Sequence, residues 1–187
     1  PRFIHLHLHS EFSLVDSTIR IGDLVKSCAK AGMPALALTD QGNLFALVKF
    51  YRAAEKAGVK PIVGADVWVE DADLKQPARL TLLCQNLEGY RNLSRLLSRG
   101  YLDGHRGERV VITPEWLHDM QGGLIALAGR ESDIGQCLLE GRADLLAVLQ
   151  GPEPVEDRGQ AVAPVETGGE QRLAVRGIHI GEVGPHD

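Results

Sequence analysis

The sequence predicts an α/β fold over its first 150 residues. Short apolar runs of strand length alternate there with segments of helical period, and this alternation is typical of βα units rather than of a bundle or a sandwich. The chain has 187 residues, 44% of them apolar, which is enough for one domain with a hydrophobic core but short for two. We therefore expect βα units packed around a single core.

The first expected units lie between the N-terminus and residue 57. Phe3 to Leu8 is predicted to be a strand, because it is apolar or aromatic at alternate positions. Ile19 to Ala31 places its apolar residues on one helical stripe, which Gly32 ends. A second strand and a second helix are expected over Ala35 to Thr39 and Leu44 to Ala57.

Further elements follow in the same manner. Pro61 to Val69 is the third expected strand, and the charged segment Glu70 to Gln76 is a turn before another strand at Leu80 to Cys84. Leu87 to Leu102 has leucines at helical spacing. Thr113 precedes a proline and a glutamate, the pattern of an N-cap, so a short helix is expected from there. A buried strand and a helix are expected at Leu124 to Ala128 and Ile134 to Leu149.

Composition changes at residue 151, so the sequence predicts two regions, 1–150 and 151–187. The second region holds 7 Gly and 4 Pro in 37 residues, has neither an aromatic residue nor a Lys, and shows no sustained period. Such a segment buries too little apolar surface to offset its ordering entropy, so we expect an irregular C-terminal tail. The tail carries 3 basic and 7 acidic residues of the chain's 20 and 25, which leaves residues 1–150 nearly neutral.

Charge, cysteines and hydropathy narrow the class of protein. A net charge of -5 argues against an autonomous nucleic-acid-binding domain. Three widely spaced cysteines, without a CxxC pair, indicate neither a disulfide framework nor a thiolate zinc site and favour a reducing, cytoplasmic setting. No apolar stretch approaches the roughly 20 residues of a membrane span, and no secretion signal is recognisable. We therefore expect a soluble, cytoplasmic protein.

Three histidines alternate with aliphatic residues near the N-terminus. On a strand, His5, His7 and His9 would share one face and the aliphatics the other. Neutral imidazole is a common zinc ligand, and βα folds place their sites at the carboxyl ends of strands, so this pattern favours a metal site. The alternative is a half-exposed strand whose histidines face solvent or are satisfied in a core.

Carboxylates occur at or near other strand ends. Asp40 and Gln41 follow the second strand, Asp66 lies in the third, and Asp16 lies in the loop after the first. Carboxylates so placed suit metal-bound water in hydrolysis. Each is also explained, singly, as a helix cap or a turn former.

Five stretches, in order along residues 1–150, closely resemble the start of the PHP (polymerase and histidinol phosphatase) domain. A domain of this kind opens the alpha subunit of bacterial DNA polymerase III, and the gammaproteobacterial subunits look most similar. The matching stretches are Phe3 to Ser17, Gly32 to Tyr51, Ala57 to Val69, Leu80 to Tyr101 and Gly122 to Gly141. The resemblance implies the first half to two thirds of a distorted seven-stranded (βα)7 barrel of PHP type. The later metal motifs of the family have no counterpart after Leu149.

The resemblance also implies a degenerate metal site. His7, His9 and Asp16 match ligand positions of the first motif, and Asp66 stands where the family often has glutamate. Residues unsuited to a hydrolytic metal occupy other expected ligand positions, namely Gln41, Arg79, Met120 and Arg130. We therefore expect no obligatory cofactor and at most one residual divalent ion, zinc or manganese. Multi-metal catalysis is not expected, and no residue is assigned a catalytic role.

Three functional hypotheses follow. The resemblance favours an N-terminal PHP portion of a replicative polymerase subunit. This portion would act as a scaffold and as the docking surface for the proofreading exonuclease. It would join the other holoenzyme subunits and would reach DNA through domains that this chain lacks. It would have no polymerase activity of its own. The alternative enzyme is a stand-alone metal-dependent phosphoesterase or 3'-5' exonuclease. The third hypothesis is a truncated product without a stable fold.

Overall fold

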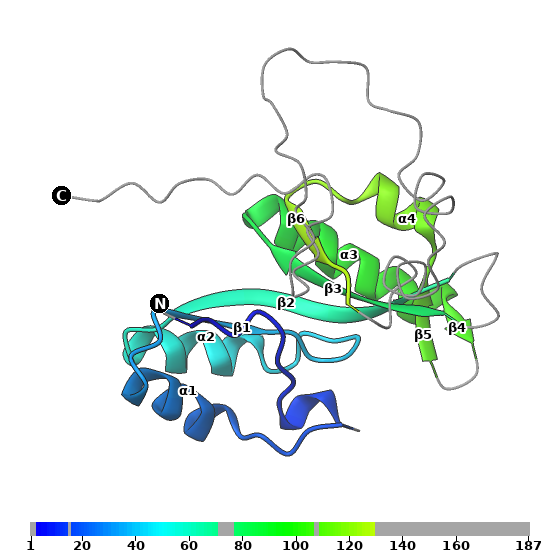
Figure 1. The fold of residues 1–187 in the computed structure, drawn as a ribbon. Coiled ribbons are helices and arrows are strands. Elements are labelled where there is room, and N and C mark those ends of the chain that lie inside the picture. Colours follow the sequence, from blue (N-terminus) through cyan, green and yellow to red (C-terminus); the bar gives the residue numbers. More distant parts are fainter. Residues whose placement is uncertain (1–2, 15, 71–76, 107–108, 130–187) are drawn as a thin grey trace, which may run out of the picture. The chain divides into compact units, whose positions relative to one another are not determined.

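The computed structural model describes residues 3–14, 16–70, 77–106 and 109–129. By its internal contacts the chain divides into two units, Pro1–Leu127 and Ala128–Asp187, and every described helix and strand belongs to the first (Figure 1). The predicted helix over 134–149, the predicted tail over 151–187 and most of the predicted charged turn lie outside the described residues.

Strand β2 (Lys60–Val69) is the centre of a mixed sheet. Its first half pairs in parallel with β1 (Ala35–Leu38). From Gly64 onward it pairs with antiparallel β3 (Ala78–Cys84), and its last two residues pair in parallel with β5 (Arg109–Ile112). Strand β6 (Leu124–Leu127) extends the sheet beyond β3. The predicted α/β class is confirmed, and the length of β2 lets it join the two halves of the sheet.

Two amphipathic helices pack beside β1. Helix α1 (Ile21–Lys30) buries Ile21, Val25 and Cys28, and helix α2 (Leu47–Lys56) buries Phe50 and Ala54. These residues form the first hydrophobic core together with Leu36 and Leu38 of β1. Both helices begin two to three residues later than the periodicity predicts, because periodicity fixes a buried face better than an end.

Helix α3 (Leu87–Asp103) covers one face of β2 and β3. Side chains alternate along β2, so Ala65, Val67 and Val69 face this helix, where they form the second core with its residues Leu93, Leu96 and Leu97. Asp66 lies between them in sequence and therefore projects from the opposite face. The second core thus fixes the direction in which Asp66 points.

Helix ends follow the predicted capping chemistry. Thr113 Oγ1 accepts a hydrogen bond from the backbone N–H of Trp116 at the start of helix α4 (Pro114–Asp119), which confirms the predicted N-cap. Asn86 caps α3 in the same way, since its side chain accepts from the N–H of Gly89.

The prediction of a strand at Phe3 to Leu8 is wrong. Of this segment, only His5 forms an isolated parallel bridge, with Leu36. The segment still follows β1, because Ala37 N–H donates to the His5 carbonyl at 2.8 Å and Thr39 N–H donates to that of Leu8 at 2.9 Å. The backbone bends at positions 6 and 7, and a 3-10 turn, η1 (Glu11–Ser13), follows. The bend breaks the strict alternation on which the three-histidine face was based.

The sequence did not predict two strands at one end of the sheet, β4 (His105–Arg106) at its edge and β5 next to it. The two-residue β4 pairs antiparallel with β5, which has four residues. Strand β4 has no apolar residue, and the apolar run of β5 is only three residues long, Val110 to Ile112, which is too short to indicate a strand. The antiparallel direction of β3 and β6 was also not predicted, since strand composition does not specify direction.

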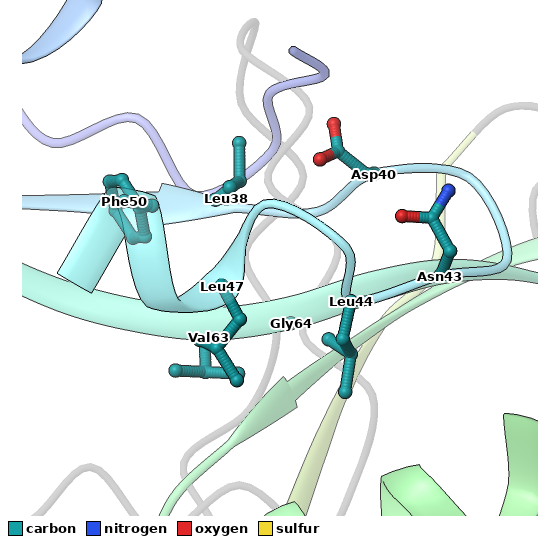
Figure 2. Close-up of a pocket in the computed structure, with 8 residues that line it drawn as sticks. All are labelled: Leu38, Asp40, Asn43, Leu44, Leu47, Phe50, Val63 and Gly64. Atoms are coloured by element: carbon teal, nitrogen blue, oxygen red, sulfur yellow. The ribbon is translucent and has the colours of Figure 1, made fainter. Parts of the chain in front are cut away.

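A small cavity lies between α2 and strands β1 and β2 (Figure 2). Its volume is about 10 Å³, the lower limit for a single water molecule. Asp40 and Asn43 line it together with apolar residues, namely Leu38, Leu44, Leu47, Phe50 and Val63. A cavity of this size excludes any substrate. Within the described part of the chain, no helix is long and apolar enough to cross a membrane.

The thiol of Cys84 provides a test of the sheet. Burial raises its pKa to about 11. Because the thiolate is the nucleophile, we expect iodoacetamide at pH 8 to alkylate Cys84 roughly 100-fold more slowly in the folded chain than in urea. Peptide mass spectrometry resolves this site from the other cysteines. Equal rates in the two conditions would show that β3 is not buried as described.

Candidate metal centre

Asp66 is the buried centre of the site. Its carboxylate is fully buried in the middle of β2. The antiparallel register places Thr81 of β3 directly opposite, and its hydroxyl donates to Asp66 Oδ1 at 2.6 Å. Thr81 was missed by the sequence reasoning, because only the register of β2 and β3 brings the two residues together. One carboxylate oxygen, Oδ2, remains directed at the N-terminal segment.

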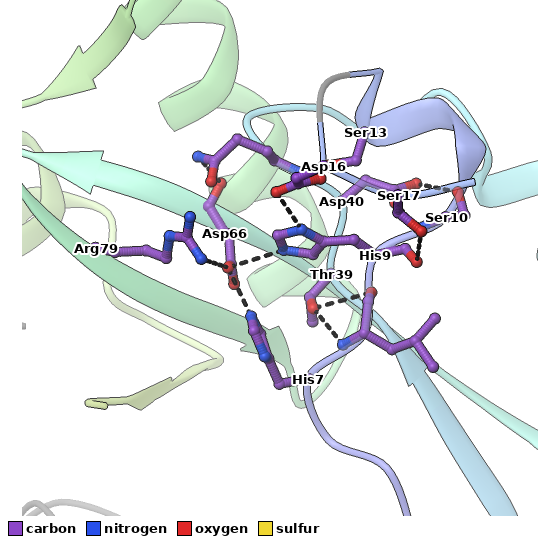
Figure 3. A network of polar contacts seen from close by, with 12 residues as sticks. His7, His9, Ser10, Ser13, Asp16, Ser17, Thr39, Asp40, Asp66 and Arg79 are labelled. Carbon is purple, nitrogen blue, oxygen red and sulfur yellow. Dashed lines mark hydrogen bonds and ion pairs between the residues drawn. The ribbon is translucent and has the colours of Figure 1, made fainter. Parts of the chain in front are cut away.

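Two imidazoles converge on that oxygen (Figure 3). His7 Nε2 lies 2.7 Å from Asp66 Oδ2, and His9 Nε2 lies 2.9 Å from the same atom. One potential ligand atom from each of the three residues lies within 4.8 Å of the others. The structure therefore brings together His7, His9 and Asp66, three of the residues predicted for the site. His5 is not in this cluster, and its ring packs edge-on against Phe3.

Asp16 takes a different place from the one expected of a ligand. Its Oδ2 lies 2.7 Å from His9 Nδ1, the ring nitrogen that faces away from Asp66. A carboxylate on the far nitrogen of an imidazole orients the ring and fixes which nitrogen faces the metal. Ser17 adds a hydrogen bond from its hydroxyl to the His9 carbonyl at 2.7 Å. Asp16 is therefore placed as a positioning partner of His9.

The charges of the site shift the pKa values of its members. The hydrogen bond to Asp66 raises the pKa of His9, against burial, and Asp16 adds to the effect. Burial by itself would raise the pKa of Asp66, but hydrogen bonds from His7, His9 and Thr81 outweigh it and lower the pKa to about 2. For Asp16, hydrogen bonds from Ser13 and His9 likewise outweigh burial and lower the pKa. Asp66 and Asp16 are thus ionised at neutral pH.

Arg79 of β3 lies at the edge of the cluster. Its Nη1 is 4.0 Å from Asp66 Oδ2, and its guanidinium lies 5.3 Å from the centre of the Trp68 ring. The guanidinium charge therefore lies next to the carboxylate that would bind a metal ion. A cation at this point competes with a metal ion for Asp66.

Asp40 supports the backbone next to His9 through hydrogen bonds with Ser10. Its two carboxylate oxygens accept from the backbone N–H and the hydroxyl of Ser10, at 2.6 and 2.8 Å. Burial raises the pKa of Asp40, although both bonds to Ser10 oppose the shift. Asp40 therefore anchors the turn that follows His9. Ser10 was missed by the sequence reasoning, although it immediately follows the histidine motif.

The other expected ligand positions lie in different surroundings. Gln41 forms an isolated parallel bridge with Asp66 and lies beside it. Met120 packs against the second core, so it is not a donor in the cluster. Arg130 lies outside the described residues.

The donor set suits one divalent ion. Two imidazole nitrogens and one carboxylate oxygen are ligands that zinc accepts, and Asp16 supplies the outer carboxylate that such sites use. A bound ion would supply a Lewis acid and lower the pKa of a bound water. At two of the other expected ligand positions, Arg79 brings a positive charge and Met120 a soft thioether, neither of which suits a hard ion.

Known proteins of one family match most of the chain. The PHP domain family matches residues 5–162. Over 158 residues, 49% are identical to a protein named DNA polymerase III subunit alpha from Xylella fastidiosa strain Temecula1, covering 76% of this chain and 13% of that protein. The subunit of the same name from Escherichia coli strain K12 is 46% identical over 149 residues, which cover 78% and 13% of the two chains.

A solved structure gives a weaker match. An amidohydrolase from Chromobacterium violaceum is 23% identical, with a TM-score of 0.42, over 51% of this chain and 32% of that chain. The family match covers most of the sequence and includes every residue of the His7, His9 and Asp66 cluster. The resemblance found in the sequence is confirmed, and the chain belongs to the PHP domain family.

Proposed function

We propose that this chain serves in DNA replication as the N-terminal PHP portion of a DNA polymerase III alpha subunit. The observation that carries the proposal is its identity of 46 to 49% to proteins of that name over about three quarters of its length. The chain spans about 13% of the length of these relatives. Polymerase chemistry is assigned to other parts of such a subunit, and this chain alone is not expected to extend a primer.

The proposed role of the chain is to hold a protein partner, the proofreading exonuclease subunit. A surface groove of about 310 Å³ supports it. Val48 and Tyr51 of α2 and Tyr90 of α3 line the groove, with 62%, 48% and 38% of their surfaces exposed. Arg52 adds a positive charge at its wall. Exposed apolar side chains gathered around a groove are typical of protein docking surfaces, and tyrosine and arginine often dominate binding.

A binding measurement tests this role. The full 187-residue chain and the exonuclease subunit of the same organism are titrated by isothermal calorimetry. We expect a 1:1 complex that Val48→Ser with Tyr51→Ser weakens at least about 10-fold, since truncation of a residue that dominates an interface costs about 2 kcal/mol or more. Tyr101→Ser, an exposed tyrosine at the other end of α3, is the matched control and should bind normally. Absence of a complex, or equal weakening by the control, would contradict the proposed docking role.

The stand-alone phosphoesterase is not favoured. Hydrolysis by two or three ions needs strong ligands at positions where this chain has Arg79 and Met120, and Gln41 would supply only a neutral oxygen. With manganese or zinc, we expect no turnover of a chromogenic phosphodiester above the buffer rate. Turnover that disappears in both His7→Ala and His9→Ala would support the enzyme instead. Primer extension by this chain would contradict the proposed division of labour within the subunit.

A further inference from the structure

Gln41 is held firmly beside the metal-binding cluster. Gln41 lies three residues after the end of β1 and forms a parallel bridge with Asp66. The two side chains therefore project to the same face of the sheet. Its backbone N–H donates to Ser13 Oγ at 2.9 Å, and its side-chain Nε2 donates to the Asp66 carbonyl at 3.3 Å. The neighbouring Gly42 N–H donates to that same carbonyl at 2.7 Å. Backbone and side chain together fix this residue against β2.

The oxygen of the same side-chain amide makes no hydrogen bond to the described residues. Gln41 Oε1 is buried and has no hydrogen-bond partner among the described residues. A buried acceptor without a partner costs about 1–3 kcal/mol, and such atoms in folded proteins usually bind water or an ion. Reversing the amide would place Oε1 against the Asp66 carbonyl, two acceptors facing each other. The contact with Asp66 therefore settles which end of the amide carries the unused atom.

We propose that Gln41 Oε1 is an oxygen ligand of a single divalent ion bound by His7, His9 and Asp66. Three donors of this centre already converge, and zinc in proteins is commonly bound by four. Gln41 supplies a neutral oxygen, so the four donors carry only the single negative charge of Asp66. Gln41 thus acts here as a donor in its own right, and the proposal holds whether or not the chain serves in replication.

Arg79 explains why such an ion would be held weakly. Its Nη1 contact to Asp66 Oδ2 is long, 4.0 Å, and 28% of its side chain is exposed. The guanidinium can stay stacked on Trp68 while the ion takes Oδ2, but its positive charge opposes the ion. Removing the charge, as in Arg79→Gln, should therefore tighten the ion.

Cobalt(II) titration tests the proposal without any assay of activity. Cobalt added to the full chain reports its coordination through the visible absorption band of a four-coordinate site, and the same titration gives the affinity. We expect Gln41→Leu to weaken cobalt binding at least about 10-fold and to change the band. Gln41→Glu, which keeps an oxygen at this position and adds a charge, should bind more tightly than the wild type. Gln121→Leu, at an exposed glutamine that contacts His118, is the matched control.

Each outcome decides the question. Loss of affinity in Gln41→Leu, with tighter binding in Gln41→Glu and Arg79→Gln, supports the assignment. A wild-type chain that binds no cobalt overturns it. So does a Gln41→Leu chain with unchanged affinity and band. Circular dichroism on every variant confirms that the comparison is made between folded chains.

Discussion

Replacement of Asp66 by alanine is expected to lower the free energy of unfolding by about 3–5 kcal/mol. The carboxylate is fully buried and receives His7, His9 and the Thr81 hydroxyl. Removing one partner of a buried charge network leaves the others without compensation, which is the costly case. Arg79 would lose its ion pair with Asp66 as well. Urea unfolding followed by circular dichroism measures the loss.

The variant Asp66→Asn removes the charge of the side chain and keeps its shape, so it measures the contribution of the charge to stability. A pKa of about 2 in place of the ordinary 3.8 corresponds to roughly 2 kcal/mol of stability at neutral pH. Because the folded pKa is the lower one, this stability is present above pH 4 and disappears as the pH falls toward 2. The gap between wild type and Asp66→Asn should close over that range.

Asp16→Asn is the matched control for Asp66, because Asp16 contacts the same imidazole but is 35% exposed. Exposed ion pairs contribute only about 0.2–1 kcal/mol. A loss in Asp16→Asn equal to that in Asp66→Asn would contradict the view that burial of Asp66 is the source of the effect.

Gly89→Ala is expected to destabilise the chain by roughly 3 kcal/mol or more, at the upper end for overpacked sites. A Cβ on Gly89 would overlap the carbonyl oxygen of Gly123 in the turn that leads into β6. That carbonyl also accepts from the N–H of Gln85 at 2.9 Å, and Gly123 itself has a φ of +71°. Neither backbone can move without breaking the first turn of α3 or the entry to β6.

Gly22→Ala provides the opposite expectation. Gly22 lies in the first turn of α1, and nothing approaches within 4 Å of a Cβ built there. Alanine is favoured over glycine in helices by up to about 1 kcal/mol, so this variant should be equally or more stable than the wild type. If Gly89→Ala unfolds at the same urea concentration as Gly22→Ala, α3 does not pack on the Gly123 turn.

The sequence predicts the central elements of the fold well and its edges poorly. Helices α1, α2 and α3 and strands β1, β2 and β3 are found where apolar period and terminal glycines place them, because one buried face governs each. Strand β5 was missed, since its apolar run is only three residues long, Val110 to Ile112. The N-terminal segment has the alternation of a strand, but hydrogen bonds to β1 and contacts with Asp66 bend it instead.

The site was predicted in composition and only partly in arrangement. His7 and His9 share a target because they are two residues apart, which the sequence shows directly. Asp66 reaches them from a strand nearly sixty residues away; its place in an expected strand made it a candidate carboxylate, and the resemblance assigned it to a ligand position. Neither Thr81 nor the outer position of Asp16 could be inferred, because both depend on the register and on the path of one loop.

The number of zinc ions that the chain binds distinguishes a single centre on Asp66 from a multi-metal site. After dialysis of the full chain against zinc, native mass spectrometry counts the ions that each folded chain retains. A single centre built on Asp66 predicts one zinc in the wild type and none in Asp66→Asn. Two or three ions per chain, or one ion that survives in Asp66→Asn, would contradict the account.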